Sequence, residues 1–321
     1  MRKGRIKRTL LWTGVAVVAL LALVVYTFTP AKLDVAAYPE PVFQASAPDP
    51  SILPETTLSV IECGKMISKQ VFIFRGGSLS KSYDSGMAAV LVRHPKGQFL
   101  FDTGFGANVD EHVKMIPALM RRLTTYDKET SAATQLKANG IDPSEIKMAI
   151  ISHSHWDHVS GLEDFPQAEA WFSREELEDI PKLPDRELVK QMSSKIKMHS
   201  LDLTGPAYEN FDRSLDLYGD GSIVFVPLPG HTPGSIGMFV NLHSGKRFFF
   251  IGDLTWALEG VELPSERPWV SRKLVDRDEA QVRAAIIKVH LLSKRYPDLV
   301  IVPAHDRRVH DRIANFPAVE R

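Results

Sequence analysis

The segment that most constrains this chain is SHSHWDHVSG, which places His153, His155, Asp157 and His158 directly after the apolar run KMAII. Crowded imidazoles repel one another when protonated and lose solvation when buried, so the cluster requires a compensating partner. In an extended segment, residues two positions apart point the same way, so His153 and His155 can share one ion. Asp157 and His158 can then turn towards a neighbouring ion. Zinc prefers imidazole and carboxylate ligands, so the segment predicts a metal site.

Three later segments supply the further ligands that a complete centre needs. FVPLPGHTPGS brings His231 after an apolar run, RFFFIGDLTW ends an apolar strand at Asp253, and LVIVPAHD ends another strand at His305. A lone histidine or aspartate at a strand end is usually an ordinary hydrogen-bonding residue, but here separate strand ends each deliver a metal-type side chain. We predict two metal ions, one on His153, His155 and His231, the other on Asp157, His158 and His305, with Asp253 bridging. No ligand role is expected for the other six histidines, which are His94, His112, His199, His243, His290 and His310.

The composition restricts both the partners and the metal ligands. The 321 residues contain 39 Lys+Arg and 39 Asp+Glu, so overall charge gives no argument for a nucleic-acid partner, and no basic patch with interleaved aromatic residues is visible. The 44% hydrophobic content is ample for a buried core. Cys63 is the one cysteine, which excludes an intrachain disulfide and a CxxC motif, and we expect it to be a small buried residue.

The N-terminal segment predicts a membrane anchor. MRKGRIKR is basic, and no charged residue follows from Leu10 to Phe28, a run that comes close to the length needed to cross a bilayer. Basic residues stay on the cytoplasmic side, so the folded part is expected to face the periplasm or the cell exterior. A cleavable signal peptide, with VAAY as its cleavage site, is the alternative and predicts a secreted protein.

Three regions follow from this reading. Residues 1–28 form the basic stub and the transmembrane helix, residues 29–56 form a proline-rich tether, and residues 57–321 form one domain. The tether has a second interpretation, a strap that lies across the domain. Short β-rich runs alternate with helical patterns after residue 57, which predicts an α/β or α+β fold. The predicted strands are TLSVIEC, QVFIF, MAAVLVRH, QFLFDTG, KMAIIS, AEAWFS, SIVFVPL, IGMFVNL, KRFFFIGD and DLVIVPAH, and the predicted helices lie near 108–122, 129–139, 173–180, 185–196 and 277–295.

The order of the motifs resembles one known superfamily. FLFDTG, SHSHWDHVSG, PGHTPGS, IGD and PAHD are similar, in this order, to the motif series of the metallo-β-lactamase-fold hydrolases. The resemblance covers roughly residues 57–310 and implies an αββα four-layer sandwich with two metal ions at one edge. It also implies that Asp102 orients the ligand loop without binding metal.

Within the superfamily, the resemblance is strongest to the N-acyl homoserine lactonase-like branch. SHSHWDHVSGLEDFPQAEAWFSREELE and SKSYDSGMAAVLVRHPKGQFLFDTG are similar to the corresponding lactonase segments. Oxygen-reducing diiron members have glutamate where His155 stands, and true β-lactamases lack a bridging carboxylate equivalent to Asp253. Members that process nucleic acid carry a large insertion that is missing here. One departure is Trp256, since the lactonases typically have tyrosine three residues after the bridging aspartate.

Together with the predicted anchor, the resemblance implies a membrane-anchored dinuclear hydrolase that opens a small-molecule lactone or ester. The expected metals are two zinc ions per chain, with other divalent metals as the alternative. Two zinc ions sharing a water lower its pKa from about 15.7 towards ~7, and the resulting bridging hydroxide attacks the carbonyl. Asp157 is the expected catalytic proton shuttle. Two alternatives are a thioester hydrolase of the glyoxalase II kind, with Arg272, Lys273, Arg307 and Arg308 binding an anionic substrate, and a non-catalytic metal-binding domain. Five apolar residues are candidates to line a substrate pocket: Phe105, Met115, Met120, Trp256 and Trp269.

Overall fold

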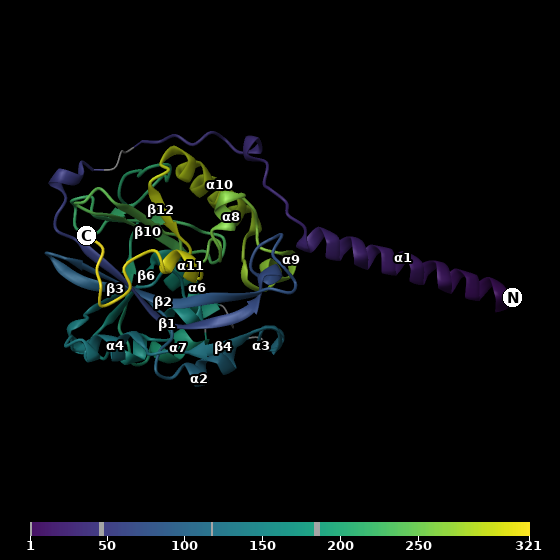
Figure 1. Cartoon of the computed structure of the whole chain (residues 1–321), viewed down its shortest axis with the longest axis horizontal. Coiled ribbons are helices and arrows are strands. Elements are labelled where there is room, and N and C mark those ends of the chain that lie inside the picture. Colours follow the sequence, from purple (N-terminus) through teal and green to yellow (C-terminus); the bar gives the residue numbers. More distant parts are fainter. Residues whose placement is uncertain (1, 45–47, 117, 183–186) are drawn as a thin grey trace.

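The computed structural model describes residues 2–44, 48–116, 118–182 and 187–321. Two mixed β-sheets pack face to face, and helices cover the outer face of each (Figure 1). This arrangement is an α/β sandwich, as the resemblance implies. The first sheet has the order β4-β1-β2-β3-β5-β6-β7, antiparallel from β4 to β3 and parallel from β3 to β7. Its strands are β1 (Thr57–Lys69), β2 (Ser82–His94), β3 (Gly97–Thr103), β4 (Thr125–Lys128), β5 (Met148–Ile150), β6 (Glu169–Ser173) and β7 (Met198–Leu201).

The second sheet has five strands in the order β12-β11-β10-β9-β8. Only the β11–β12 pair is parallel, and the other pairs are antiparallel. Its strands are β8 (Leu215–Asp216), β9 (Ile223–Pro227), β10 (Ile236–Asn241), β11 (Arg247–Phe250) and β12 (Leu299–Val302).

The main core lies between the two sheets. Phe99 and Phe101 of β3 both face Phe225 of β9, with ring centroids 6.4 and 6.1 Å apart. Leu100, between them in sequence, points to the opposite face and packs with Leu136, because side chains alternate along a strand. Helices close both outer faces. Those on the first sheet are α2 (Val109–His112), α4 (Ala132–Ala138), α5 (Trp156–Val159), α6 (Arg174–Asp179) and α7 (Glu187–Met192), and those on the second are α8 (Glu259–Glu262) and α10 (Glu279–Arg295).

Short helical turns complete the chain. The remaining helices are α3 (Ala118–Leu123), α9 (Trp269–Val275) and α11 (Arg307–His310). The 3-10 turns are η1 (Val35–Ala37), η2 (Pro50–Ile52), η3 (Gln70–Phe72), η4 (Val113–Met115), η5 (Pro143–Glu145), η6 (Leu162–Asp164) and η7 (Ile180–Lys182).

The prediction of a strand at QVFIF is wrong. Lys69 pairs with Ser82, so the chain reverses between these residues and the segment forms the turn η3 in the connection of the β1–β2 hairpin. The helix expected near 108–122 is divided into α2, η4 and α3, and residue 117 lies outside the described residues, as do residues 185 and 186 of another predicted helix. Cys63 is fully buried, as expected.

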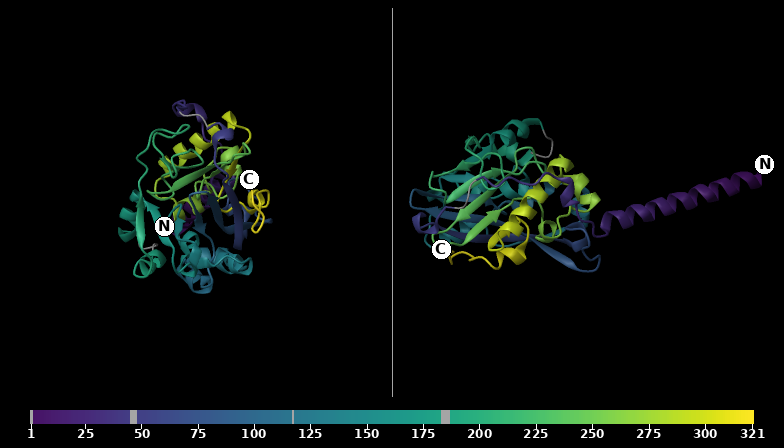
Figure 2. Two further views of the ribbon diagram at one scale, coloured as in Figure 1. Left: turned by 90° about the vertical axis from the view of Figure 1, so that its left-hand side faces the viewer. Right: turned by 90° about the horizontal axis from the view of Figure 1, so that it is seen from above.

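The N-terminal helix α1 (Arg2–Phe28) projects away from the sandwich (Figure 2). Its residues Arg5–Phe28 are long and apolar enough to cross a membrane, a property that signal sequences share. The described residues between 29 and 56 run along the surface of the domain. The amide of Leu33 donates to the carbonyl oxygen of Pro264 at 2.7 Å, and the amide of Gln44 donates to that of Glu209 at 3.0 Å. These contacts correspond to the strap interpretation of the segment.

Candidate metal centre

The loop that follows β5 carries four of the predicted ligands. His153 lies in its extended part, His155 immediately precedes α5, and Asp157 and His158 lie in the single turn of that helix. The change from extended to helical backbone points the second pair of side chains in a different direction from the first pair. One short segment therefore presents ligands to two adjacent positions.

The strand topology brings the other three residues to the same place. β9, β11 and β12 run in one direction, so their carboxyl ends meet at one edge of the second sheet. His231, Asp253 and His305 each follow one of these ends. The amide of Ile236, at the start of β10, donates to the carbonyl oxygen of Ser152 at 3.0 Å and so ties this edge to the loop after β5.

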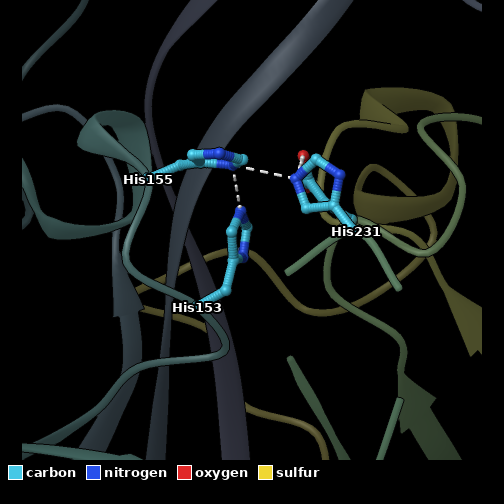
Figure 3. Close-up of side chains that lie close together, drawn as sticks. His153, His155 and His231 are labelled. Carbon is cyan, nitrogen blue, oxygen red and sulfur yellow. Dashed lines mark hydrogen bonds and ion pairs between the residues drawn. The ribbon is translucent and has the colours of Figure 1, made fainter. Parts of the chain in front are cut away.

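Three imidazoles point their nitrogens at one another (Figure 3). The Nδ1 atom of His155 lies 2.8 Å from the Nε2 atom of His153 and 2.8 Å from the Nε2 atom of His231. One ring nitrogen offers either one proton or one lone pair, so it cannot form two equivalent hydrogen bonds of this kind. Three converging lone pairs are instead the arrangement that a cation satisfies. Ligand atoms of His153, His155, His231 and Asp253 all lie within 4.8 Å of one another.

A second group adjoins the first and shares Asp253 with it. The Asp157 Oδ2 atom lies 3.4 Å from His305 Nε2 and 3.9 Å from His158 Nε2. Asp253 directs its Oδ1 atom at the second group, 3.0 Å from His305 Nε2 and 3.3 Å from His158 Nε2. Its Oδ2 atom lies 3.4 Å from His231 Nε2 in the first group. All seven predicted ligands thus lie together, with Asp253 between the two groups.

The ring nitrogens that face away from the centre have acceptors of their own. His158 Nδ1 lies 2.8 Å from Asp102 Oδ2, His231 Nδ1 2.9 Å from Asp276 Oδ1, and His305 Nδ1 2.9 Å from the carbonyl oxygen of Gly86. An acceptor at Nδ1 holds a proton there, so Nε2 is the nitrogen that faces inward and would offer its lone pair to a bound ion. Asp102 also accepts the amide of Ser152 at 2.7 Å, so it orients the ligand loop as the resemblance implies. Asp276 was not among the predicted site residues.

Glu176 is a second residue that the sequence did not reveal. Its buried carboxylate accepts the amide of Ser154 at 2.8 Å from the ligand loop, and the Thr232 hydroxyl at 2.6 Å and the Gly234 amide at 3.1 Å from the loop of His231. It therefore holds the two ligand-bearing loops together. The pattern Ser-x-x-Glu from Ser173 signals a helix start, and the Ser173 hydroxyl does cap α6, but nothing in that pattern indicates the contacts across loops.

The electrostatics of the centre divide the histidines into two kinds. Burial, with repulsion from His158 and His155, holds the pKa of His153 well below its ordinary value. Burial also disfavours charge on His158, but the neighbouring carboxylates of Asp102 and Asp157 outweigh it and raise the pKa of His158 well above its ordinary value. Negative charge is therefore concentrated around the second group, where it attracts a positive charge.

Two buried atoms test whether these residues fit a metal ion. Among the described residues, neither His158 Nε2 nor Asp253 Oδ1 forms a hydrogen bond, although both are buried and lie only 3.3 Å apart. A buried polar atom without a partner costs about 1–3 kcal/mol, so an ion that accepted both would remove this penalty. The donor set of imidazole nitrogens and carboxylate oxygens suits zinc. The residues fit a dinuclear site.

An apolar cavity opens onto the centre. It reaches His155, Asp157, His231, Asp253 and His305 at its inner end. The remaining lining is largely apolar and includes Met66, Phe72, Ile73, Met87, Met115, Ile116, Met120, Leu123, Trp156, Leu188, Trp256, Val270, Leu274 and Val275. Among the described residues of the lining there is no lysine or arginine, and Glu187 is the one carboxylate outside the centre.

Three of the five predicted pocket residues line this cavity. Met115, Met120 and Trp256 do so. Phe105 is instead buried in the core against Trp156, and Trp269 is not part of the lining. The prediction that Phe105 lines the pocket is wrong because an aromatic residue after a strand can pack in the core or form a pocket wall, and the local sequence does not distinguish the two. The indole Nε1 of Trp256 donates to Asp253 Oδ2 at 2.7 Å, and the Arg267 guanidinium lies 4.6 Å from the indole ring.

A family model of the metallo-beta-lactamase superfamily matches residues 86–305, the stretch that contains all seven predicted metal ligands. The chain belongs to the metallo-β-lactamase superfamily. Among curated relatives, the probable metallo-hydrolase Rv2300c of Mycobacterium tuberculosis is 29% identical over 245 residues, which cover 68% of this chain and 73% of that protein. The N-acyl homoserine lactonase AttM of Agrobacterium fabrum is 27% identical over 240 residues, which cover 73% of this chain and 86% of that protein.

Two solved structures of lactone-hydrolysing enzymes share the fold of this chain. An N-acyl homoserine lactone hydrolase with the product N-hexanoyl-L-homoserine at its catalytic metal centre has a TM-score of 0.67 at 16% identity, covering 84% of this chain and 100% of that chain. AidC, a dizinc quorum-quenching lactonase in complex with a product, has a TM-score of 0.54 at 16% identity, covering 83% of this chain and 90% of that chain. The family match and the AttM relatives confirm the resemblance to the lactonase branch.

Proposed function

We propose that this metallo-β-lactamase-fold chain is a dinuclear zinc hydrolase that opens a neutral, apolar lactone or ester. The observation that carries the proposal is the pair of ligand groups joined by Asp253 at the inner end of an apolar cavity. In the proposed centre, His153, His155 and His231 would hold one ion, Asp157, His158 and His305 would hold the other, and Asp253 would be a ligand to both. Relatives that are N-acyl homoserine lactonases support the substrate class.

Hydrolysis adds water across the acyl C–O bond, with hydroxide going to the carbonyl carbon and a proton to the alkoxide that leaves. Zinc held by these residues would supply an activated water at neutral pH and would polarise the carbonyl. The chain positions the groups around that reaction: the apolar walls bind the acyl part of the substrate and exclude bulk water. Asp276 and Asp102 keep the ligand imidazoles in the tautomers that face the centre.

Asp157 is the proposed proton carrier as well as a ligand. It lines the cavity, and its side chain is 13% exposed, so its carboxylate is accessible to a substrate. We assign its carboxylate to receive the proton that water loses and to pass it to the departing alkoxide oxygen. Trp256 occupies the position where the resemblance implies a tyrosine. Its indole N–H donates a hydrogen bond to Asp253, so Trp256 contributes to the orientation of that carboxylate.

The charges around the cavity favour this reaction over thioester hydrolysis of the glyoxalase II kind. The four basic residues that such an anionic substrate would need are all paired with carboxylates: Arg272 with Glu266, Lys273 with Glu279, Arg307 with Glu129 and Arg308 with Glu259. A non-catalytic metal-binding domain, the other alternative, gives no account of an apolar cavity that leads to the centre.

We further propose that α1 stays attached and anchors the domain on the periplasmic or outer side of the membrane. The alternative is a secreted form released by signal cleavage. Support for the anchor comes from the length and exposure of α1 and from the basic residues at its N-terminal end.

A substrate panel tests the proposed activity. The full-length chain, reconstituted in vesicles and loaded with zinc, is offered lactones, aryl esters, thioesters and phosphodiesters. We expect zinc-dependent turnover of lactones or aryl esters, and loss of that turnover in His155→Ala. The matched control is His199→Ala, a histidine that stacks on Trp171 away from the centre and should leave turnover unchanged. Equal rates for His155→Ala and the unaltered chain would refute the proposal.

A further inference from the structure

The C-terminal end of α1 is attached directly to the hydrolase domain. The carbonyl oxygen of Phe28 accepts the amide of Gly76 at 3.1 Å, and the Phe28 ring lies edge-on to the Phe72 ring with centroids 6.0 Å apart. The carbonyl oxygen of Thr29 accepts the Nε–H of Arg75 at 3.0 Å, and α1 also packs against α9. No flexible spacer separates the helix from the domain at this point, so the domain cannot stand away from whatever surrounds α1.

The elements that receive α1 are also walls of the cavity. Phe72 of η3 and Leu274 of α9 line it, and the Ser271 hydroxyl donates to the carbonyl oxygen of Phe72 at 2.6 Å, which joins η3 to α9. Figure 1 shows α1 leaving the molecule at the end where α9 lies, with α3 at the same end. The cavity is therefore built from the part of the domain nearest to α1.

Exposed apolar side chains surround this end of the domain. We name these five residues, with their exposed fractions, the apolar rim: Leu79 at 70%, Met115 at 39%, Leu119 at 49%, Leu123 at 39% and Leu274 at 40%. Met115, Leu123 and Leu274 belong to the cavity lining, and Leu79 lies in the hairpin connection that contacts Phe28. Soluble surfaces rarely gather large apolar side chains in this way without a partner.

Charge beside the apolar rim identifies the chemistry of that partner. Arg121 and Arg122 of α3 are exposed, and within the described residues no carboxylate pairs with either of them. Apolar side chains next to unpaired arginines are typical of segments that lie in the boundary between lipid headgroups and acyl chains. A bilayer crossed by α1 would begin where α1 meets the domain.

We propose that the apolar rim rests in the outer boundary of the bilayer that α1 crosses, and that the cavity admits amphiphilic esters or lactones directly from the lipid. This inference depends on the proposed function and on the proposed anchor. A substrate with a long acyl chain is concentrated in the membrane, and its chain enters along the apolar walls while its carbonyl reaches the centre. Short, water-soluble esters do not require this route.

A fluorescent label on the apolar rim measures the membrane contact without using activity. Leu119→Cys is labelled with the environment-sensitive fluorophore NBD in the full-length chain, reconstituted in vesicles of neutral and anionic phospholipid. Cys63 does not compete for the label, since it is buried and burial raises its pKa to about 12. The matched control is Ile52→Cys, an exposed apolar position of η2 at 73% exposure. We expect lipids that carry a nitroxide spin label on the acyl chain to quench the label at 119 and not at 52, whereas equal quenching at both positions overturns the proposal.

A second experiment tests delivery of substrate. Leu79→Asp and Leu119→Asp are combined in one variant, since neither residue lines the cavity or contacts the centre, and Ile52→Asp is the control. In vesicles we expect the double variant to hydrolyse a decanoyl aryl ester about tenfold more slowly and an acetyl aryl ester at the unaltered rate. Equal rates of the double variant and the control on both esters overturn the inference. Absence of turnover of either ester by the unaltered chain overturns the proposed function instead, while the lipid quenching still decides the membrane contact.

Discussion

Asp253 connects the two ligand groups. Its two oxygens face different groups, and it is buried between His158, His231 and His305. The positive imidazoles of His305 and His158 outweigh the effect of burial and hold the pKa of Asp253 well below its ordinary value, so it is a carboxylate at neutral pH. An anion in this position offers one ligand atom to each of two cations.

Replacing Asp253 by alanine should therefore weaken metal binding at both groups. We expect the bound zinc to fall from two equivalents to one or fewer, and hydrolysis to fall by at least about 100-fold. Metal content is measured by elemental analysis of the purified full-length chain, and turnover with the ester found in the substrate panel. Asp212→Ala, at an exposed carboxylate far from the centre, is the control. Two tightly held equivalents in Asp253→Ala would rule out a bridging role.

Asp276 acts through His231 rather than on substrate. It accepts from His231 Nδ1 at 2.9 Å and from the Arg267 guanidinium at 2.7 Å. Asp276→Asn keeps the size of the side chain but removes its charge, so the imidazole becomes a weaker donor to metal. We expect about a 10–100-fold loss of zinc affinity, measured by competition with a chromogenic chelator. Asp278→Asn, two residues away, retains a helix cap at α10 and should keep full affinity. An unchanged affinity in Asp276→Asn would show that the contact is only structural.

At the scale of elements, the ligands that follow strands were predictable and their supports were not. His153, His231, Asp253 and His305 each follow an apolar run, so local sequence indicates both the strand and the polar side chain at its end. The roles of Glu176 and Asp276 depend on contacts between loops that are distant in sequence. No local pattern encodes such contacts, which exist only after the two sheets have packed.

The difference between local sequence patterns and contacts with distant segments also explains the errors in the predicted secondary structure. Most of the long apolar strands were predicted because their side chains alternate or are continuously buried. β4 was missed because all four of its side chains are exposed, and it exists only through its pairing with β1. QVFIF has strand-like composition, but it lies where the β1–β2 hairpin reverses, and that position is decided by the pairing of Lys69 with Ser82.

Glu176 gives a prediction about the two loops that it connects. Glu176→Ala leaves the amides of Ser154 and Gly234 and the Thr232 hydroxyl without their acceptor in a buried place. We expect the free energy of unfolding to fall by about 3 kcal/mol and zinc affinity to fall with it. Chemical denaturation monitored by circular dichroism measures the first effect, and chelator competition the second. Glu175→Ala removes a neighbouring carboxylate that pairs with Arg213 at the surface and should cost less than about 1 kcal/mol. Similar losses in the two variants would contradict the assigned role.

For the whole molecule, the centre lies where independent parts of the fold meet. The first sheet contributes the loop after β5, and the second sheet contributes the ends of β9, β11 and β12. A metal ion held by residues of both sheets therefore links the two halves of the sandwich. Without the ion, buried imidazoles and carboxylates face one another, and two of their atoms form no hydrogen bond among the described residues.

Removal of metal should accordingly destabilise the entire domain. A ligand that binds only the folded state raises the free energy of unfolding by about 2.7 kcal/mol when present at 100 times its dissociation constant. Ions at both sites would each contribute to this stabilisation. We expect dialysis against a strong chelator to lower the midpoint of thermal unfolding by roughly 5 °C or more, and stoichiometric zinc to restore it. The measurement is differential scanning fluorimetry of the full-length chain in vesicles, with Asp253→Ala as the variant whose midpoint should respond least to zinc. A midpoint that is the same with and without zinc in the unaltered chain would mean that the residues converge without binding metal.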